Sequence, residues 1–310
     1  MSILVVGSVA YDTVETPFGR AERVLGGSAS FFSVAASFFV PVNLVAVVGE
    51  DFGEREMAAF RGRGIGLEGL ERAAGETFHW SGRYNYDLNA RETVFTHLNV
   101  FEHFKPRLPA SYRDSEHVFL GNIHPVLQRE VLDQARAAKL VVCDTMNYWI
   151  SRTPEELKET LRRVDVLLIN DAEARELSGE WNMVRAARTI RDLGPVVLVV
   201  KKGEHGVLMF GEEGSFAAPA YPLEEVFDPT GAGDTFAGGF MGYLAAERAA
   251  GAPARGRADD QTLRRAVIMG STLASFCVEA FSLDRLLRLT RREIDERFRL
   301  FKRLTHFEDI

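Results

Sequence analysis

The sequence predicts an α/β protein in which helices cover both faces of a mostly parallel central sheet, with a second, smaller β-sheet attached. Two patterns lead to this class. After Pro106, short apolar runs alternate with helical stretches, and such alternation implies parallel strands joined by helices. Between Thr77 and Phe104, apolar and polar side chains instead alternate one by one, which is typical of paired strands with one covered face.

The first part of the chain is expected to begin the parallel sheet. Residues 3–6 are a short apolar run, as in buried parallel strands. The Gly-Gly-Ser sequence at 26–28 then opens a helix that extends to residue 39, with Ser28 as its cap. Residues 44–48 are expected to form the next strand of the same sheet.

The alternating segment predicts a β-hairpin. Its first strand carries aromatic side chains on one face, residues 87–91 supply a turn, and residues 93–100 return as the second strand. Because paired strands with such a face need a surface to pack on, the hairpin is expected to lie over another part of the molecule. The aromatic side chains are Phe78, Trp80, Tyr84 and Tyr86.

The second half predicts the remaining strands and helices. Polar side chains gather where its strands end, which is the edge at which open α/β sheets bind ligands; among them are Asn122, Asp144 and Asn147. Residues 247–261 are expected to be a mobile loop. The strands are expected at 117–120, 140–143, 166–169 and 196–200, and the helices at 127–138, 154–163, 183–193, 263–278 and from 290 onward.

Bulk properties exclude several classes of protein. The net charge of −7 over 310 residues argues against a nucleic-acid or anionic-membrane partner. The two cysteines, Cys143 and Cys277, lie in apolar segments and fit reduced core residues. No apolar run reaches membrane-spanning length and no basic leader precedes the first strand, so we expect a soluble, cytoplasmic protein.

Residues 228–244 carry the strongest functional pattern. Pro229 favours an extended Asp228, so a strand is expected to end there, and Thr230 is a good N-cap for the helix that follows. Gly231, Ala232 and Gly233 have almost no side-chain bulk, so their N–H groups are free to close around an anion at the positive end of the helix dipole. Asp234 follows in the first turn, where its carboxylate suits deprotonation of a hydroxyl beside a bound phosphoryl group. Phe236, Phe240 and Leu244 fall on one buried helix face.

The string Asp-Pro-Thr-Gly-Ala-Gly-Asp-Thr-Phe at 228–236 closely resembles the C-terminal signature of the ribokinase-like family, the PfkB-type carbohydrate and nucleoside kinases. The resemblance implies a kinase that uses ATP and Mg²⁺, with Asp234 as base and Gly231, Ala232 and Gly233 as anion hole. It also implies a single ribokinase-like domain over residues 1–310, with a β-sheet lid formed by about residues 10–25 and 77–104. Such lids often form dimer interfaces, so a homodimer through the lid is expected.

The resemblance extends to further residues of this chain. Asp12, Gly26 and Gly27 match family positions that seat the phosphate acceptor. Asn170-Asp-Ala-Glu173 resembles a motif associated with magnesium and phosphate, which assigns Glu173 to the metal, mostly through water. The nucleotide-binding residues implied in this way are Asn170, Lys201, Gly203, Gly206 and Thr230.

Phe31 departs from the family pattern, which usually has asparagine there. The phenyl ring either stacks on an aromatic group of the acceptor or packs in the core with Phe32. Stacking would favour a nucleoside as acceptor. We expect a sugar, with a nucleoside as the alternative, and the sequence does not name the compound.

Two other functions agree less well with the sequence. A non-catalytic ligand-binding protein of the same fold is disfavoured by the intact Asp234 and anion hole. A dinucleotide-dependent oxidoreductase rests only on the Gly-x-Gly-x-x-Gly match at 64–69, which follows a helical stretch and not the strand that this motif requires.

Overall fold

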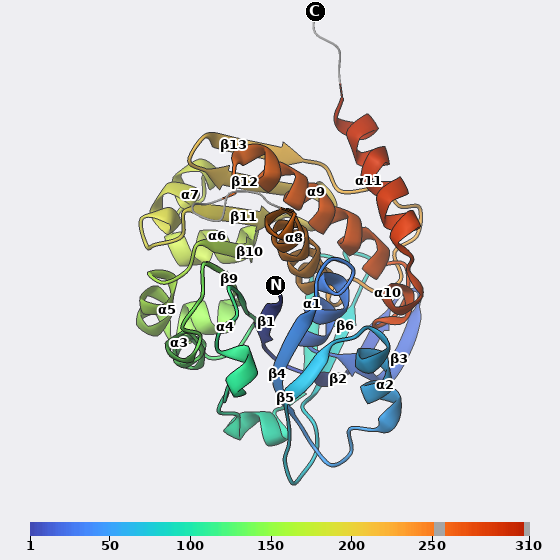
Figure 1. The fold of residues 1–310 in the computed structure, drawn as a ribbon. Coiled ribbons are helices and arrows are strands. Elements are labelled where there is room, and N and C mark those ends of the chain that lie inside the picture. The colour runs from blue at the N-terminus through green and yellow to red at the C-terminus, as the bar shows by residue number, and fades with distance from the viewer. Residues whose placement is uncertain (251–257, 307–310) are drawn as a thin grey trace, which may run out of the picture.

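A nine-stranded sheet forms the centre of the computed structural model, which describes residues 1–250 and 258–306. The strands follow the order β13-β12-β11-β10-β9-β8-β1-β4-β5, and all run in the same direction except β12, which is antiparallel to both of its neighbours (Figure 1). Their bounds are β1 Ile3–Val6, β4 Val42–Val48, β5 Gly66–Arg72, β8 His117–Leu120, β9 Leu140–Asp144, β10 Val166–Asn170, β11 Val197–Lys201, β12 Val207–Gly211 and β13 Gly214–Ala218.

Helices cover both faces of this sheet, as the alternating sequence pattern predicts (Figure 1). One face is covered by α1 Ser28–Ala36, α2 Glu54–Gly62, α8 Ala232–Ala249, α9 Asp260–Cys277, α10 Asp284–Arg288 and α11 Arg291–Thr305. The other is covered by α3 Pro125–Gln134, α4 Asn147–Arg152, α5 Pro154–Leu161, α6 Asp171–Ser178 and α7 Met183–Arg191. Short 3-10 helices occur at Asn99–His103, Ala110–Tyr112 and Gly203–His205.

The period-2 geometry of the strands divides the core into two layers. In β1, Ile3 and Val5 join the cluster under α1, α8 and α9, whereas Leu4 and Val6 join the cluster under α3 to α7. All four side chains are fully buried. The predicted α/β class with a mostly parallel sheet is therefore confirmed.

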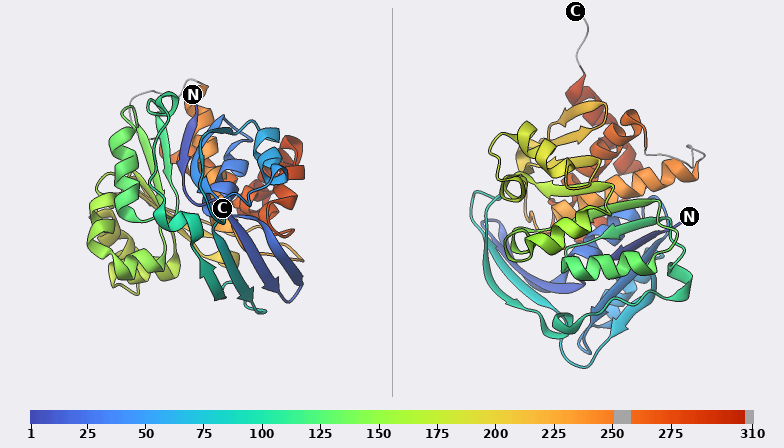
Figure 2. Two further views of the ribbon diagram at one scale, coloured as in Figure 1. Left: turned by 90° about the horizontal axis from the view of Figure 1, so that it is seen from below. Right: turned by 90° about the vertical axis from the view of Figure 1, so that its left-hand side faces the viewer.

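A second sheet of four strands, the lid sheet, lies at one end of the molecule (Figure 2). Its order is β3-β2-β6-β7, with β2 parallel to β6 and antiparallel to β3. The predicted hairpin is thus present as β6 and β7. The bounds of the four strands are β2 Ala10–Thr16, β3 Gly19–Gly26, β6 His79–Tyr84 and β7 Arg91–His97.

Part of the aromatic face of the hairpin turns toward the body of the protein, whereas Tyr86 on that face is 84% exposed. Tyr84 is buried, and its hydroxyl accepts a hydrogen bond from Thr230 Oγ1 at 3.2 Å. The expected homodimer stays a prediction. His79, Phe95 and His97 contact one another on the opposite face.

Two predicted helix caps are wrong for the same reason. Gly27 and Gly231 hold the N-cap positions of α1 and α8, with φ values of 91° and 76°. Such positive φ angles favour glycine over Ser28 or Thr230, which lie one residue away. The strand expected to end at Asp228 is also absent, because the Phe227 N–H bonds the Val278 carbonyl at the end of α9 (2.9 Å).

The hairpin β12–β13 and strand β5 were not predicted. Part of the loop expected at 247–261 lies outside the described residues, and the part within them includes the ends of α8 and α9. Among the helices of the described ranges, none combines the length and the apolar character needed to cross a bilayer.

The stacked pair Phe32–Phe119 joins α1 to the centre of the sheet, and we predict that it is a major source of stability. The two rings are fully buried, nearly parallel and 3.8 Å apart between centroids. Phe32→Ala should lower the free energy of unfolding by about 3–5 kcal/mol, measured by denaturant titration. Trp181→Ala, at a side chain that is 84% exposed, is the control, and equal losses in both variants would contradict the prediction.

Candidate active site

The glycine-rich turn before α8 forms the floor of the site. Its left-handed Gly231 lies directly against the ring of Phe31, since a Cβ added at Gly231 would come within 2.5 Å of that ring. The first N–H groups of a helix have no partner within it, so the start of α8 presents free donors. The Ala232 N–H, which was expected to bind an anion, instead donates a hydrogen bond to the Pro229 carbonyl at 3.2 Å.

Phe31 packs in the core. The residue is only 1% exposed and belongs to the cluster beneath α1 and α8. Of the two alternatives drawn from the sequence, the structure corresponds to core packing. The ring supports Gly231 from below and offers no open face to an acceptor, so the argument for stacking on Phe31 is wrong.

An ion pair crosses the site between two strands of the central sheet. Lys201 ends β11 and its Nζ lies 3.0 Å from Asp144 Oδ2 at the end of β9. The two side chains are only 17% and 9% exposed. The same Nζ would be 3.1 Å from a Cβ placed on Gly233, so Lys201 reaches the start of α8. Burial lowers the pKa of Lys201, but the carboxylates of Asp144, Glu173 and Asp234 together raise it above its usual value.

Asp234 lies beside this pair in the first turn of α8. Burial raises the pKa of its carboxyl group, and the negative charge of Asp144 raises it further. The positive charges of Lys201 and Arg91 act in the opposite direction. A carboxylate whose pKa is shifted upward toward neutrality is a stronger base than an ordinary aspartate, which suits proton abstraction from a hydroxyl.

Glu173 occupies the neighbouring start of α6. Its side chain accepts from the Asn170 N–H, and Asn170 Oδ1 accepts from the Glu173 N–H, both at 2.8 Å. This reciprocal capping box fixes both residues at the edge where β10 ends. Burial and the charge of Asp144 raise the pKa of Glu173 to about 7.

The predicted acceptor residues lie together where the lid sheet meets the central sheet. Asp12 in β2 is 6% exposed, and a Cβ at Gly26 in β3 would sit 1.9 Å from its Oδ2. Gly26 therefore leaves the space that the carboxylate fills. Gly27, at φ 91°, has no room for a side chain against the Ser8 carbonyl. Burial and the charge of Asp228 raise the pKa of Asp12 to about 7.

The turn between β11 and β12 holds the predicted nucleotide residues Gly203 and Gly206, both with positive φ. The tip of the lid touches this turn. A Cβ on Gly203 would lie 1.9 Å from Asn89 Oδ1, and Asn89 Nδ2 donates to Glu204 Oε1 at 3.3 Å. The lid thus extends from the predicted acceptor residues to the turn that is predicted to bind the nucleotide.

Sequence reasoning missed Arg91, which begins β7 opposite Tyr84. Directly opposed residues of two strands share a face, so Arg91 lies on the inward face of the lid. The pKa values of Asp12, Glu173 and Asp234 are raised overall, and the positive charge of Arg91 opposes part of that rise. These three carboxyl groups come from three different elements. The alternation of the hairpin shows which residues share a face, but it does not show which face meets the body of the protein, so this pattern alone does not identify Arg91. The sequence identifies Asp144 only as a polar residue at the end of a strand.

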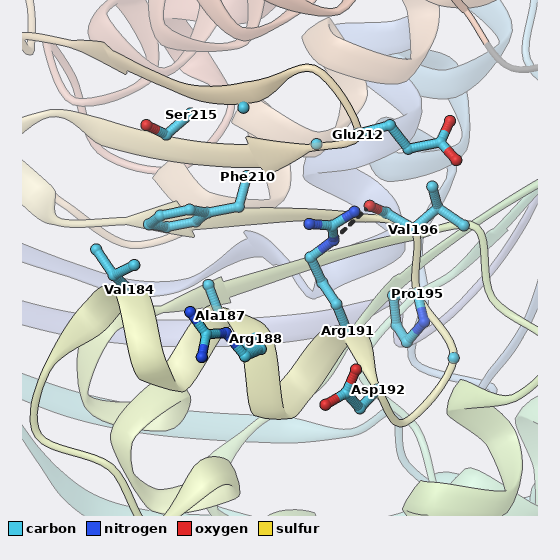
Figure 3. Close-up of a pocket in the computed structure, with 13 residues that line it drawn as sticks. Val184, Ala187, Arg188, Arg191, Asp192, Pro195, Val196, Phe210, Glu212 and Ser215 are labelled. Atoms are coloured by element: carbon cyan, nitrogen blue, oxygen red, sulfur yellow. Dashed lines mark hydrogen bonds between the residues drawn. The ribbon is translucent and has the colours of Figure 1, made fainter.

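A cavity of about 550 Å³ lies away from this site, between α7 and the β12–β13 turn (Figure 3). Arg191 borders it and donates to the Val196 carbonyl at 2.8 Å. Val196 precedes β11, whereas Lys201 ends that strand, so roughly 16 Å of strand separates the two regions. The cavity shares none of its lining residues with the predicted site.

The fold and the carboxylate site are consistent with a phosphotransferase, and comparison with known proteins identifies the family. The pfkB family carbohydrate kinases match residues 2–286, and the chain therefore belongs to this family. It is a kinase that transfers a phosphoryl group to an alcohol, and pfkB kinases use ATP as donor.

Curated relatives and solved structures agree with this assignment. The cytidine kinase of Thermococcus kodakarensis is 31% identical over 252 residues, covering 78% of this chain and 88% of that protein. The nucleoside kinase of Methanothermobacter thermautotrophicus is 26% identical and covers 89% of both chains. Giardia lamblia ribokinase shares the fold with a TM-score of 0.80 at 22% identity, covering 97% of this chain and 99% of the other.

The raised pKa of Asp234 predicts a stability change that depends on pH. The folded state binds this proton more tightly than the unfolded state, so wild-type stability declines as pH rises and the buried group ionises. Asp234→Asn removes that cost. Its melting temperature should exceed that of wild type, with a larger difference at about pH 8 than at about pH 5. A difference that does not change with pH would contradict this.

Proposed function

We propose that the protein is a nucleoside kinase, which transfers the γ-phosphoryl group of ATP to a ribose hydroxyl of a nucleoside. The similarity to the Thermococcus cytidine kinase over most of both chains carries this proposal. The similarity to the Methanothermobacter nucleoside kinase supports it across almost the whole length. A nucleoside thus replaces a simple sugar as the preferred acceptor.

In the proposed reaction, the buried Asp12 carboxylate binds the hydroxyls of the ribose beside Gly26 and Gly27. Asp234 accepts the proton of the attacking hydroxyl, whose oxygen forms a bond to the γ-phosphorus while the bond to the bridging oxygen of ADP breaks. The N–H groups around Gly231 and Gly233 and the ammonium of Lys201 stabilise the charge of the moving phosphoryl group. The turn at Gly203 and Gly206, with Thr230, contacts the nucleotide.

The residues of the site fit a Mg²⁺ ion that is held mainly by phosphates and water. Within the described ranges, no group of three or more His, Cys, Asp or Glu side chains is arranged to hold a metal ion alone. Mg²⁺ usually binds one or two carboxylates and keeps several waters, a demand that Glu173 and Asp144 can meet beside Asn170. The ion would neutralise negative charge on the phosphates during transfer.

A screen for ADP release tests the proposal. Wild-type protein with ATP and Mg²⁺ is offered cytidine, other nucleosides and free sugars, and nucleosides should give the highest kcat/KM. Asp234→Asn should lower turnover about 10²- to 10⁴-fold while ATP binding persists, as for loss of a positioned base. Activity on sugars alone would contradict the acceptor, and a fully active Asp234→Asn would remove the base from the mechanism.

Arg91 supplies a further test, because its charge acts on the carboxylates around the proposed path of the phosphoryl group. Arg91→Gln should lower kcat about 10²- to 10³-fold, the usual effect of losing one group that stabilises transition-state charge. Arg83→Gln is the matched control, since Arg83 pairs with Glu15 on the outer face of the lid. Equal kcat values in the two variants would contradict a role for Arg91.

A further inference from the structure

We propose that Trp80 is the platform on which the base of the nucleoside stacks. This inference rests on the proposed function and deepens it, because it assigns the part of the acceptor that a free sugar lacks. Phe31 cannot have this role, since its ring is buried beneath Gly231. Trp80 lies in β6 of the lid sheet and remains partly exposed.

The strand register places Trp80 beside the proposed ribose site. Trp80 is the partner of Asp12 in the parallel pairing of β2 with β6, so the two residues lie side by side on neighbouring strands. Adjacent strands are about 4.8 Å apart, a distance that a base attached to a ribose can span. Tyr84, four residues along the same strand and therefore on the same face, reaches Thr230 of the glycine-rich turn. The face that carries Trp80 is thus the face that covers the site.

The absence of a side chain at Gly82 lets the indole lie flat along the strand. A Cβ added at Gly82 would lie 2.1 Å from Cη2 and 2.3 Å from Cζ2 of Trp80, so the ring covers the backbone of that residue. The indole Nε1–H reaches Thr93 Oγ1 on β7 at 3.4 Å, which fixes one edge. One face of the ring is therefore against the sheet, and the other is turned toward the body of the protein.

These contacts hold the ring rigidly and make it a surface on which any nucleobase can stack. Every nucleobase has a flat π-face, and stacking on an aromatic side chain does not depend on its hydrogen-bonding edge. The guanidinium of Arg91 lies 5.8 Å from the centre of the indole, so the ring adjoins the cation that acts on Asp12 and Asp234. A nucleoside held by Asp12 would thus have its base over Trp80 and its reacting hydroxyl toward Asp234.

Steady-state kinetics of Trp80→Ala, Trp80→Phe and wild type with cytidine and ATP test the proposal. Trp80→Ala should raise KM for cytidine by about tenfold or more with KM for ATP unchanged, and Trp80→Phe should recover most of the loss. Trp181→Ala, at an exposed tryptophan in the segment before α7, is the matched control and should behave as wild type. A KM for cytidine within twofold of wild type in Trp80→Ala, or equal rises in both KM values, would overturn the platform.

A second measurement does not depend on turnover or on the folding of Trp80→Ala. The chain has three tryptophans, so the Trp149→Phe, Trp181→Phe double variant, once shown to be active, reports on Trp80 alone. Cytidine added without ATP should quench its fluorescence, and D-ribose should not. No quenching by cytidine would overturn the platform while leaving nucleoside phosphorylation intact. Wild-type activity confined to base-free sugars would instead overturn both the platform and the proposed function.

Discussion

The ion pair between Lys201 and Asp144 is the interaction on which the rest of the site depends. It links the last residue of β9 to the last residue of β11 and places an ammonium group near Asp144, Glu173 and Asp234. Like charges in a poorly solvated site repel strongly, and the fold tolerates this cluster because Lys201 offsets part of it. Burial, together with the remaining repulsion from Asp144, raises the pKa of Asp234 and Glu173. The same electrostatic imbalance would be relieved by any bound cation.

Topology explains why the parts of the site meet. The chain places β4 and β5 on one side of β1 and β8 to β11 on the other, so the strand order reverses between β1 and β8. Loops diverge at such a point and leave room for ligands at the carboxyl ends of the strands. The lid sheet grows from the end of β1, which brings Asp12 to this opening. Asp234 lies in the first turn of α8, the helix that packs against α1.

Short-range chemistry made much of this predictable from sequence. Apolar runs located the strands, and the glycine-rich turn located α8 and Asp234, because these features are local. The inward role of Arg91 and the flat placement of Trp80 on Gly82 depend on which face of a hairpin meets the body. That choice is tertiary and no local pattern encodes it. The position of Phe31 is undetermined by the sequence for a similar reason. A phenyl ring near the site could pack in the core or contact the acceptor, and only the placement of Gly231 against the ring distinguishes the two.

The contact between Asn89 and the turn at Gly203 and Glu204 has a thermodynamic consequence. One hairpin carries Trp80 at its base, over the proposed acceptor region, and its tip touches the proposed nucleotide turn. Any ligand that steadies the hairpin in this position lowers the conformational entropy left to be lost when the second ligand binds. Linkage makes the effect reciprocal, so each ligand strengthens binding of the other by the same factor. We therefore expect the lid to couple the two binding events positively.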